Sequence, residues 1–185
     1  MIFHETRLSG AFVIDLEKYE DERGFFARSW CCEEFEHQGL NNRLVQCNIS
    51  FNNKKGTVRG MHYQTPPFAE AKLVRCTRGS LVDVIVDLRP SSPTFLQQTA
   101  VRMNESNRLA LYVPEGFAHG FQTLADDTEV FYQMSQFYSP EHAFGICWND
   151  PILNITWPEP ISIIAEKDLS YPICELTQFE VFNQL

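Results

Sequence analysis

Residues 56–75 read GTVRGMHYQTPPFAEAKLVR, and the interpretation of the whole chain starts from this stretch. Its polar and apolar residues alternate in two strand-like runs, which a Pro-Pro turn joins. Polar side chains interleaved with apolar ones indicate that one face of the sheet is not ordinary core. A face that carries His62 and Lys72 beside Val74 fits the wall of a pocket in which a proton moves. A half-solvated pair of strands would show the same pattern, so both interpretations stay open at this point.

Short apolar runs separated by turn residues continue on both sides of this stretch. Many short strands at regular spacing are typical of an all-β sandwich or barrel. In addition to 57–64 and 72–77, we predict strands at 11–16, 43–51, 80–88, 97–103, 108–113, 117–124 and 128–135. Residues 31–38 predict a helix, because their glutamates lie early and Gly39 can end it.

The composition is that of an ordinary globular protein, and residues 1–185 are expected to form one domain. After about residue 140 the sequence predicts a tail that wraps back over the barrel, with a short helical turn at 166–168. Because the net charge is −9, a nucleic acid would be repelled, and we expect none as a partner.

The six cysteines show no CxxC spacing and no Cys/His cluster, which argues against a thiolate zinc site. No apolar run approaches the ~20 residues that a membrane span needs. The first residues are too polar for the apolar core of a secretory signal. We therefore expect a cytoplasmic protein with reduced cysteines and no membrane partner.

Residues 43–51 alternate almost strictly between apolar and polar side chains. One face carries the apolar residues Val45, Cys47, Ile49 and Phe51. The other face carries the polar residues Gln46, Asn48 and Ser50. Two amides on one strand face suit hydrogen bonding to a ligand. A solvated outer face explains the same pattern as simply, so the sequence leaves the choice open.

Four side chains have the chemistry needed to take a proton from a carbon next to a carbonyl group. His62 is the candidate base, and Asp168 can fix the tautomer and orientation of its imidazole. Tyr132 shares a strand face with apolar residues, so its phenol stays protonated and can act as an acid. Lys72 supplies a positive charge. A lone histidine in a strand is more often an ordinary core or surface residue, so the role of His62 depends on these groups converging.

Residues 114–119, PEGFAH, match the second half of the cupin pattern PxGxxH and offer a metal site as an alternative. His62 and His119 with Glu70 could form a facial triad for iron or manganese. Metal-binding cupins also carry an HxH pair in their first half, whereas here His62 is followed by Tyr63 and Gln64. The metal site is therefore the weaker interpretation, and the PEG residues equally suit a tight turn between strands.

Nine segments, taken in order, resemble the dTDP-4-dehydrorhamnose 3,5-epimerase family. They are DERGFF (21–26), VQCN (45–48), KGTVRGMHYQ (55–64), KLVR (72–75), VDLRPSSPT (86–94), YVPEGFAHGF (112–121), EVFYQMS (129–135), WNDP (148–151) and EKD (166–168). The match covers nearly the whole chain. The combination of RGMHYQ, PEGFAHGF and the downstream Tyr132 is specific, whereas single fragments would be weak.

This resemblance implies a cupin-type jelly-roll β-barrel with a few short helices, a homodimer, and no metal or organic cofactor. It also implies a dTDP-linked substrate, dTDP-4-dehydro-6-deoxy-D-glucose, which is epimerised at C3 and C5 to dTDP-4-dehydro-L-rhamnose for surface polysaccharide. By the same resemblance His62 is the base with Asp168 as its partner, Tyr132 is the acid, and Lys72 steadies the enolate. The family's contacts to nucleotide or sugar correspond to Arg23, Gln46, Asn48, Arg59, His119 and Lys167.

The chain departs from the family pattern at a few positions. Arg28 stands where many members have a glutamate, and Ala143 where a second acidic residue is common. Cys147 replaces the arginine of GIRWxDP. Arg28 and Ala143 remove two negative charges near the nucleotide site, which leaves open the preferred base and whether one or two carbons are epimerised. A mono-epimerase acting at C3 or C5 of a related nucleotide-linked 4-keto sugar is the alternative.

Overall fold

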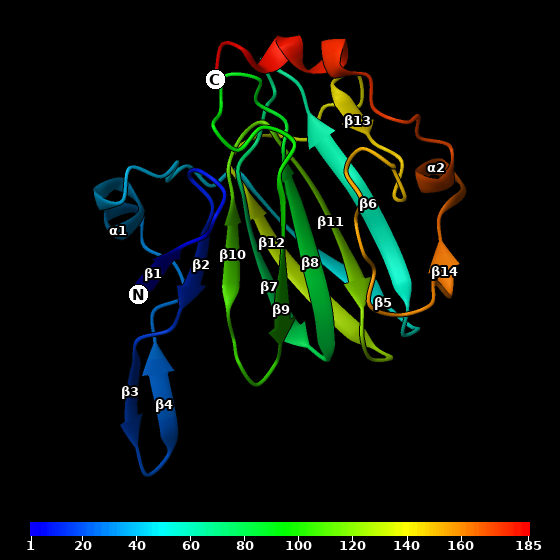
Figure 1. Cartoon of the computed structure of the whole chain (residues 1–185). Helices are drawn as coiled ribbons and strands as arrows, with labels where there is room; N and C mark the ends of the chain where they lie inside the picture. The colour runs from blue at the N-terminus through cyan, green and yellow to red at the C-terminus, as the bar shows by residue number, and fades with distance from the viewer.

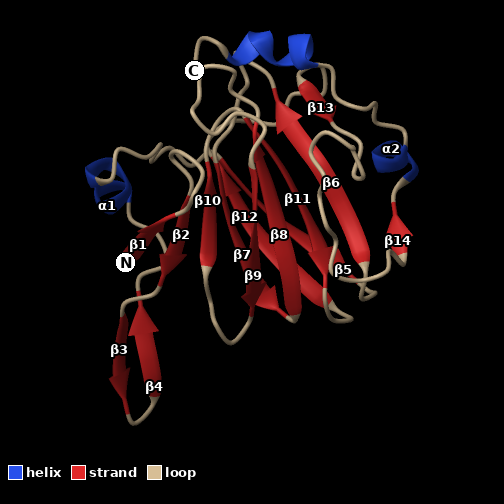
Figure 2. Cartoon of the chain, in the orientation of Figure 1, coloured by secondary structure: helices blue, strands red, loops and turns tan.

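Strands make up most of the computed structural model, which describes residues 1–185 (Figures 1 and 2). The first sheet runs in the order β1 (Ile2–Glu5), β2 (Phe12–Asp15), β10 (Ala110–Val113), β7 (Lys72–Arg78), β12 (Thr128–Met134) and β5 (Gln46–Asn52). The second runs β13 (Ala143–Gly145), β6 (Thr57–Gln64), β11 (Phe117–Thr123), β8 (Ser80–Asp87) and β9 (Gln98–Asn104), with β14 (Ile163–Ile164) beside β6. A separate hairpin consists of β3 (Lys18–Asp21) and β4 (Gly24–Ala27). The helical segments are α1 (Cys32–His37), α2 (Glu166–Leu169) and a 3-10 helix at Leu176–Phe182.

The two larger sheets enclose an apolar core between them. Because side chains alternate along a strand, every second residue of each sheet points into this core. Val74 on β7, Leu81 and Ile85 on β8, and Leu111 on β10 all belong to it and are completely buried. The predicted all-β jelly roll with a few short helices is confirmed. None of the helices has the length and apolarity that crossing a membrane requires.

Most predicted strands are present, and the differences have local causes. The strand predicted at 43–51 begins only at Gln46 and continues to Asn52 as β5. The strand predicted at 108–113 begins at Ala110, because Arg108 has a φ of 53°, outside the strand region. The sequence did not predict β1, whose residues pair with β2 at the edge of the first sheet.

A bulge in β6 decides which side chains enter the space between the sheets. The register of β6 against β11 shifts between His62 and Arg59, as the position of Gly60 predicted. Gly60 has a φ of 132°, and a Cβ at this position would lie 2.5 Å from the Cα of Gly120. Only glycine fits there. Strict alternation would separate Arg59 from His62, and the bulge lets both side chains line the same cavity.

Of the residues after 140, β13, β14 and α2 lie on the β6 side of the second sheet, and the 3-10 helix crosses the end of the sheets (Figure 1). Both β13 and β14 pair with β6. Phe179 and Phe182 from the 3-10 helix pack on Tyr63, with ring centroids 6.4 and 5.8 Å away, in a second apolar cluster. The segment therefore brings α2 next to β6, where it contributes side chains to the cavity described below.

Candidate active site

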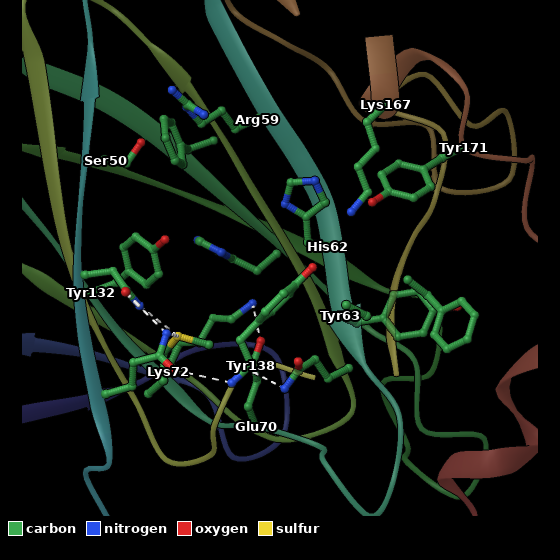
Figure 3. Close-up of a pocket in the computed structure, with 18 residues that line it drawn as sticks. Ser50, Arg59, His62, Tyr63, Glu70, Lys72, Tyr132, Tyr138, Lys167 and Tyr171 are labelled. Atoms are coloured by element: carbon green, nitrogen blue, oxygen red, sulfur yellow. Dashed lines mark hydrogen bonds and ion pairs between the residues drawn. The ribbon is translucent and has the colours of Figure 1, made fainter. Parts of the chain in front are cut away.

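A cavity of about 340 Å³ opens between the two sheets (Figure 3). Strands β5, β7 and β12 of the first sheet contribute to its walls, as do β6, β11 and β13 of the second and the segment around α2. A cavity of this size can hold a small molecule. Its lining contains most of the residues singled out in the sequence, namely Gln46, Asn48, Arg59, His62, Lys72, His119, Tyr132 and Lys167.

His62 on β6 and Asp168 on α2 form a hydrogen-bonded pair. Nε2 of His62 lies 2.7 Å from Oδ1 of Asp168, whose other oxygen accepts a hydrogen bond from the backbone N–H of Gly60 at 3.1 Å. Burial would raise the pKa of Asp168, but the contacts with His62 and Gly60 and the charge of Arg59 hold it below its ordinary value. Asp168 is thus an anion that fixes Nε2, and Nδ1 is the imidazole nitrogen left free to accept a proton.

Tyr132 lies on β12, on the wall of the cavity opposite His62 (Figure 3). Its strand neighbours Val130 and Met134 are buried, as the alternation predicted. Burial raises the pKa of Tyr132; the charge of Arg59 partly opposes this effect, and Glu70 adds to it. The phenol therefore carries its proton at neutral pH and can donate it.

Lys72 on β7 belongs to a buried ion pair in the cavity wall. Its Nζ lies 2.9 Å from Oε1 of Glu70, and the two side chains are only 9% and 6% exposed. Gln64 donates a hydrogen bond to the other carboxylate oxygen at 3.0 Å. The sequence suggested Glu70 only as a metal ligand, whereas the structure makes it the partner of Lys72. A fixed ammonium group can stabilise negative charge that develops on a nearby oxygen.

A second histidine–aspartate pair lies beside the first. His119 on β11 is directly opposite His62 in the register, and its Nε2 is 2.9 Å from Oδ2 of Asp83. The other oxygen of Asp83 is buried without a hydrogen-bond partner. Sequence reasoning missed Asp83, although an aspartate inside the apolar strand at residues 80–88 was a usable signal, because buried carboxylates need partners.

The facial triad suggested by the cupin pattern is not formed. His62, His119 and Glu70 each have another partner, and no three histidine, cysteine, aspartate or glutamate side chains come together in a group that could hold a metal ion.

The polar face of β5 turns toward the cavity and not toward solvent. Gln46, Asn48 and Ser50 line the cavity, and Gln46 donates a hydrogen bond to the side-chain oxygen of Asn48 at 3.2 Å. The interpretation as a solvated outer face was wrong. The apolar face of the strand is the one that lies outside, where Ile49 is 64% exposed and Phe51 is also exposed.

The hairpin of β3 and β4 projects away from the two larger sheets (Figure 1), and Arg23 in its turn does not line the cavity. Arg23 lies in the turn between β3 and β4, where its side chain is 86% exposed and forms an ion pair with Asp21 at 2.5 Å. Arg28, just beyond β4, is paired with Glu34 at 2.7 Å. Of the positions that depart from the family pattern, only Ala143 lines the cavity.

Several aromatic residues around the cavity were missed in the sequence. Tyr138 precedes β13, Phe144 is the middle residue of this strand, and Tyr171 follows α2; all three line the cavity. Phe144 stacks on Tyr63 with ring centroids 6.0 Å apart. These aromatic residues lie in stretches whose sequence shows no strand-like alternation. Only their position near the WNDP and EKD segments indicated that they could belong to the site.

Comparison with known proteins gives a consistent result. A family model described as dTDP-4-dehydrorhamnose 3,5-epimerase matches residues 5–175. A protein of that name from Sinorhizobium fredii is 42% identical over 178 residues, covering 95% of this chain and 91% of the relative. The crystal structure of dTDP-6-deoxy-D-glucose-3,5-epimerase from Legionella pneumophila in complex with dTDP-4-keto-L-rhamnose has a TM-score of 0.86 at 36% identity, covering 95% and 93% of the two chains.

A 3'-monoepimerase from Streptomyces bikiniensis, solved in complex with dTDP-quinovose, is also similar. Its TM-score is 0.85 at 30% sequence identity, with 98% of this chain and 91% of that chain covered. The similarity of both structures extends along nearly the whole chain. Since the matching family model and the curated relative both span most of its length, this chain belongs to the dTDP-4-dehydrorhamnose 3,5-epimerase family.

Proposed function

We propose that this isomerase epimerises dTDP-4-dehydro-6-deoxy-D-glucose at C3 and C5 to give dTDP-4-dehydro-L-rhamnose, with His62 as the base and Tyr132 as the acid. The observation that carries the assignment of roles is their placement on opposite walls of one cavity (Figure 3). The carboxylate of Asp168 fixes the imidazole of His62, and the phenol of Tyr132 remains protonated.

The chemistry follows from the ketone at C4 of the sugar. Loss of a proton from the adjacent carbon is feasible because the electron pair left behind spreads onto the ketone oxygen as an enolate. His62 takes this proton through Nδ1, while Lys72 and His119 stabilise the negative oxygen. Tyr132 then gives its proton to the same carbon from the opposite face, so that a C–H bond of inverted configuration forms. Exchange with solvent restores both side chains for the next step.

The remaining cavity residues bind the nucleotide sugar in this proposal. Arg59 and Lys167 are cations in the lining, and a guanidinium group suits the oxygens of a diphosphate. The amides of Gln46 and Asn48 offer hydrogen bonds to hydroxyl groups or to the base. Ala143 places no negative charge on its part of the wall.

We infer that two copies of the chain associate through the outer face of β5 and the hairpin of β3 and β4. The exposed Ile49 and Phe51 lie on an edge strand, and the hairpin exposes Phe26. Large exposed apolar side chains of this kind mark interaction sites, and two-fold homodimers are the commonest assembly. In such a dimer Arg23 at the hairpin tip would contact the nucleotide bound by the other copy.

The mass in solution tests this assembly. Light scattering should give twice the monomer mass, and Ile49→Glu should give the monomer because a charge cannot be buried unpaired at an interface. A monomeric wild-type protein that is fully active would contradict both the dimer and the role of Arg23.

We also infer that the protein works in the cytoplasm. All six cysteines are free in the structure, and disulfides are rare where glutathione and thioredoxin keep thiols reduced. Fractionation of cells that produce the protein, followed by an activity assay of the soluble and membrane fractions, would test this.

Proton exchange tests the reaction most directly. Incubation of dTDP-4-dehydro-6-deoxy-D-glucose with the enzyme in D2O should place deuterium at both C3 and C5, as measured by NMR. Deuterium at only one carbon would favour a mono-epimerase, the activity of the similar Streptomyces bikiniensis protein. Binding of the substrate without any deuterium would remove catalysis on this sugar.

A further inference from the structure

Tyr171 is a cavity residue to which the proton-transfer steps give no role. It lies three residues after Asp168, and its ring stands nearly perpendicular to the imidazole of His62, at 72° and a centroid distance of 5.8 Å. Figure 3 shows it on the side of His62 that faces away from Tyr132. The ring therefore packs against the imidazole without competing for the space between base and acid.

The backbone of β13 provides the place for this ring. A Cβ at Gly145 would overlap atoms of the Tyr171 ring, so the ring lies directly against the glycine. Gly145 is in turn the residue of β13 that pairs with His62 on β6. Tyr171 thus occupies a space that only a glycine leaves open, immediately beside the base.

The hydroxyl group of Tyr171 faces a cation. The ammonium group of Lys167 lies beside this hydroxyl (Figure 3), with its Nζ 5.9 Å from the centroid of the Tyr171 ring, and the phenol raises the pKa of Lys167. Burial raises the pKa of Tyr171, against the opposing effect of Lys167. Lys167 forms no ion pair with any carboxylate of the chain. Its partner is therefore a neutral phenol.

A neutral partner has a different effect from a charged one. The carboxylate of Glu70 holds Lys72 in place and also compensates its charge. The phenol of Tyr171 can hold Lys167 in place while leaving the full positive charge for an incoming anion. Such an ammonium group is ordered before binding, so the ligand loses less free energy in ordering it.

We propose that Tyr171 is a positioning residue of this active site, whose hydroxyl aims Lys167 at the diphosphate of the nucleotide sugar and whose ring supports the imidazole of His62. The inference rests on the proposed function for the nature of the anion. The hydroxyl group and the ring of Tyr171 thus make separate contributions, and a separate variant tests each one.

Removal of the hydroxyl tests the first contribution. Tyr171→Phe should weaken binding of dTDP, measured by calorimetry, by about tenfold, because the polar contact of the hydroxyl with the ammonium group is lost. KM for the sugar nucleotide should rise by a similar factor, and kcat should fall by less than threefold. The decisive measurement is the double variant Lys167→Met/Tyr171→Phe, which should bind dTDP no more weakly than Lys167→Met alone.

Removal of the ring tests the second contribution. Tyr171→Ala should lower kcat at least tenfold further than Tyr171→Phe, because the imidazole loses its support. Gly145→Ala should lower kcat in the same way, because its methyl group displaces the ring. Leu169→Ala is the matched control, since Leu169 belongs to the same segment, is 52% exposed and does not line the cavity. Thermal unfolding of each variant identifies losses that come from misfolding.

The results that would overturn the inference are specific. Equal weakening of dTDP binding by Tyr171→Phe with and without Lys167 would mean that the hydroxyl does not act through the lysine. An unchanged Kd for Tyr171→Phe would show that the hydroxyl group does not assist binding. Equal kcat values for Tyr171→Phe and Tyr171→Ala would show that the ring does not support the imidazole. Because dTDP binding is measured without turnover, a failure of the proposed epimerisation would be visible separately, as wild-type protein that binds dTDP but exchanges no proton.

Discussion

The buried pair of Lys72 and Glu70 gives a prediction whose size can be worked out from the structure. Coulomb's law at 2.9 Å, with an effective dielectric constant of about 20, gives an attraction of about 6 kcal/mol. Desolvation of the two groups offsets part of this. Lys72→Met should nevertheless cost about 3–5 kcal/mol of unfolding free energy, because it leaves the carboxylate of Glu70 buried without a compensating charge.

The double variant Lys72→Met/Glu70→Gln should recover most of that loss, since no uncompensated charge remains in the wall. The matched control is Lys55→Met. Lys55 pairs with Glu159 at the same distance of 2.9 Å, but these side chains are 49% and 31% exposed. An exposed pair contributes about 0–1 kcal/mol, so this variant should be nearly neutral.

Urea unfolding at pH 7, followed by tryptophan fluorescence at one protein concentration, measures all four proteins. The same samples are assayed for proton exchange at C3 and C5. The double variant should be stable yet lose at least 100-fold in exchange rate, because the group that stabilises the enolate is gone. The reasoning is refuted if Lys72→Met costs no more than Lys55→Met, or if the double variant is less stable than Lys72→Met alone.

Three further outcomes are expected, two from the groups that transfer protons and one from Asp168. His62→Ala should abolish deuterium exchange, and detectable exchange at either carbon would assign the base elsewhere. Tyr132→Phe should slow inversion about 100-fold or more while proton loss continues, so NMR should find deuterium in unepimerised substrate; equal loss of both would contradict its role as the acid. The pKa of Asp168 is lowered in the folded state, so its carboxylate stabilises the fold above the unfolded value near 3.8, and this contribution disappears as the pH falls through the folded-state pKa. The stability difference between wild type and Asp168→Asn should therefore be present at pH 7 and shrink below pH 3.8, and a difference that grows on acidification would reverse the sign of the argument.

Local pattern was enough to predict most of the fold. Period-two alternation and turn residues located the strands, and Gly60 predicted the bulge in β6. The ends of the strands were predicted less accurately, because nothing in the sequence indicates the left-handed backbone conformation of Arg108. The strand β1 was missed because its few residues owe their conformation to pairing with β2.

The composition of the site was harder to predict, because it depends on contacts between distant segments. Alternation predicted the apolar setting of Tyr132, but it could not predict whether the polar face of β5 meets solvent or a cavity. The chemistry of a carboxylate made Asp168 a candidate partner of His62, but the pattern gave no evidence that the two residues meet. The partners Glu70 and Asp83 became visible only when the distances to Lys72 and His119 were known.

The pairing of His62 with Asp168 spans 106 positions of the sequence. During synthesis the strands that form both sheets leave the ribosome first, since chains emerge from the N-terminus at roughly 5–20 residues per second. A ribosome that stalls before residue 166 would release a nearly finished β-structure whose imidazole has no anchor. Catalytic competence would then be the last property the nascent chain acquires, and shortened products would bind little and convert nothing.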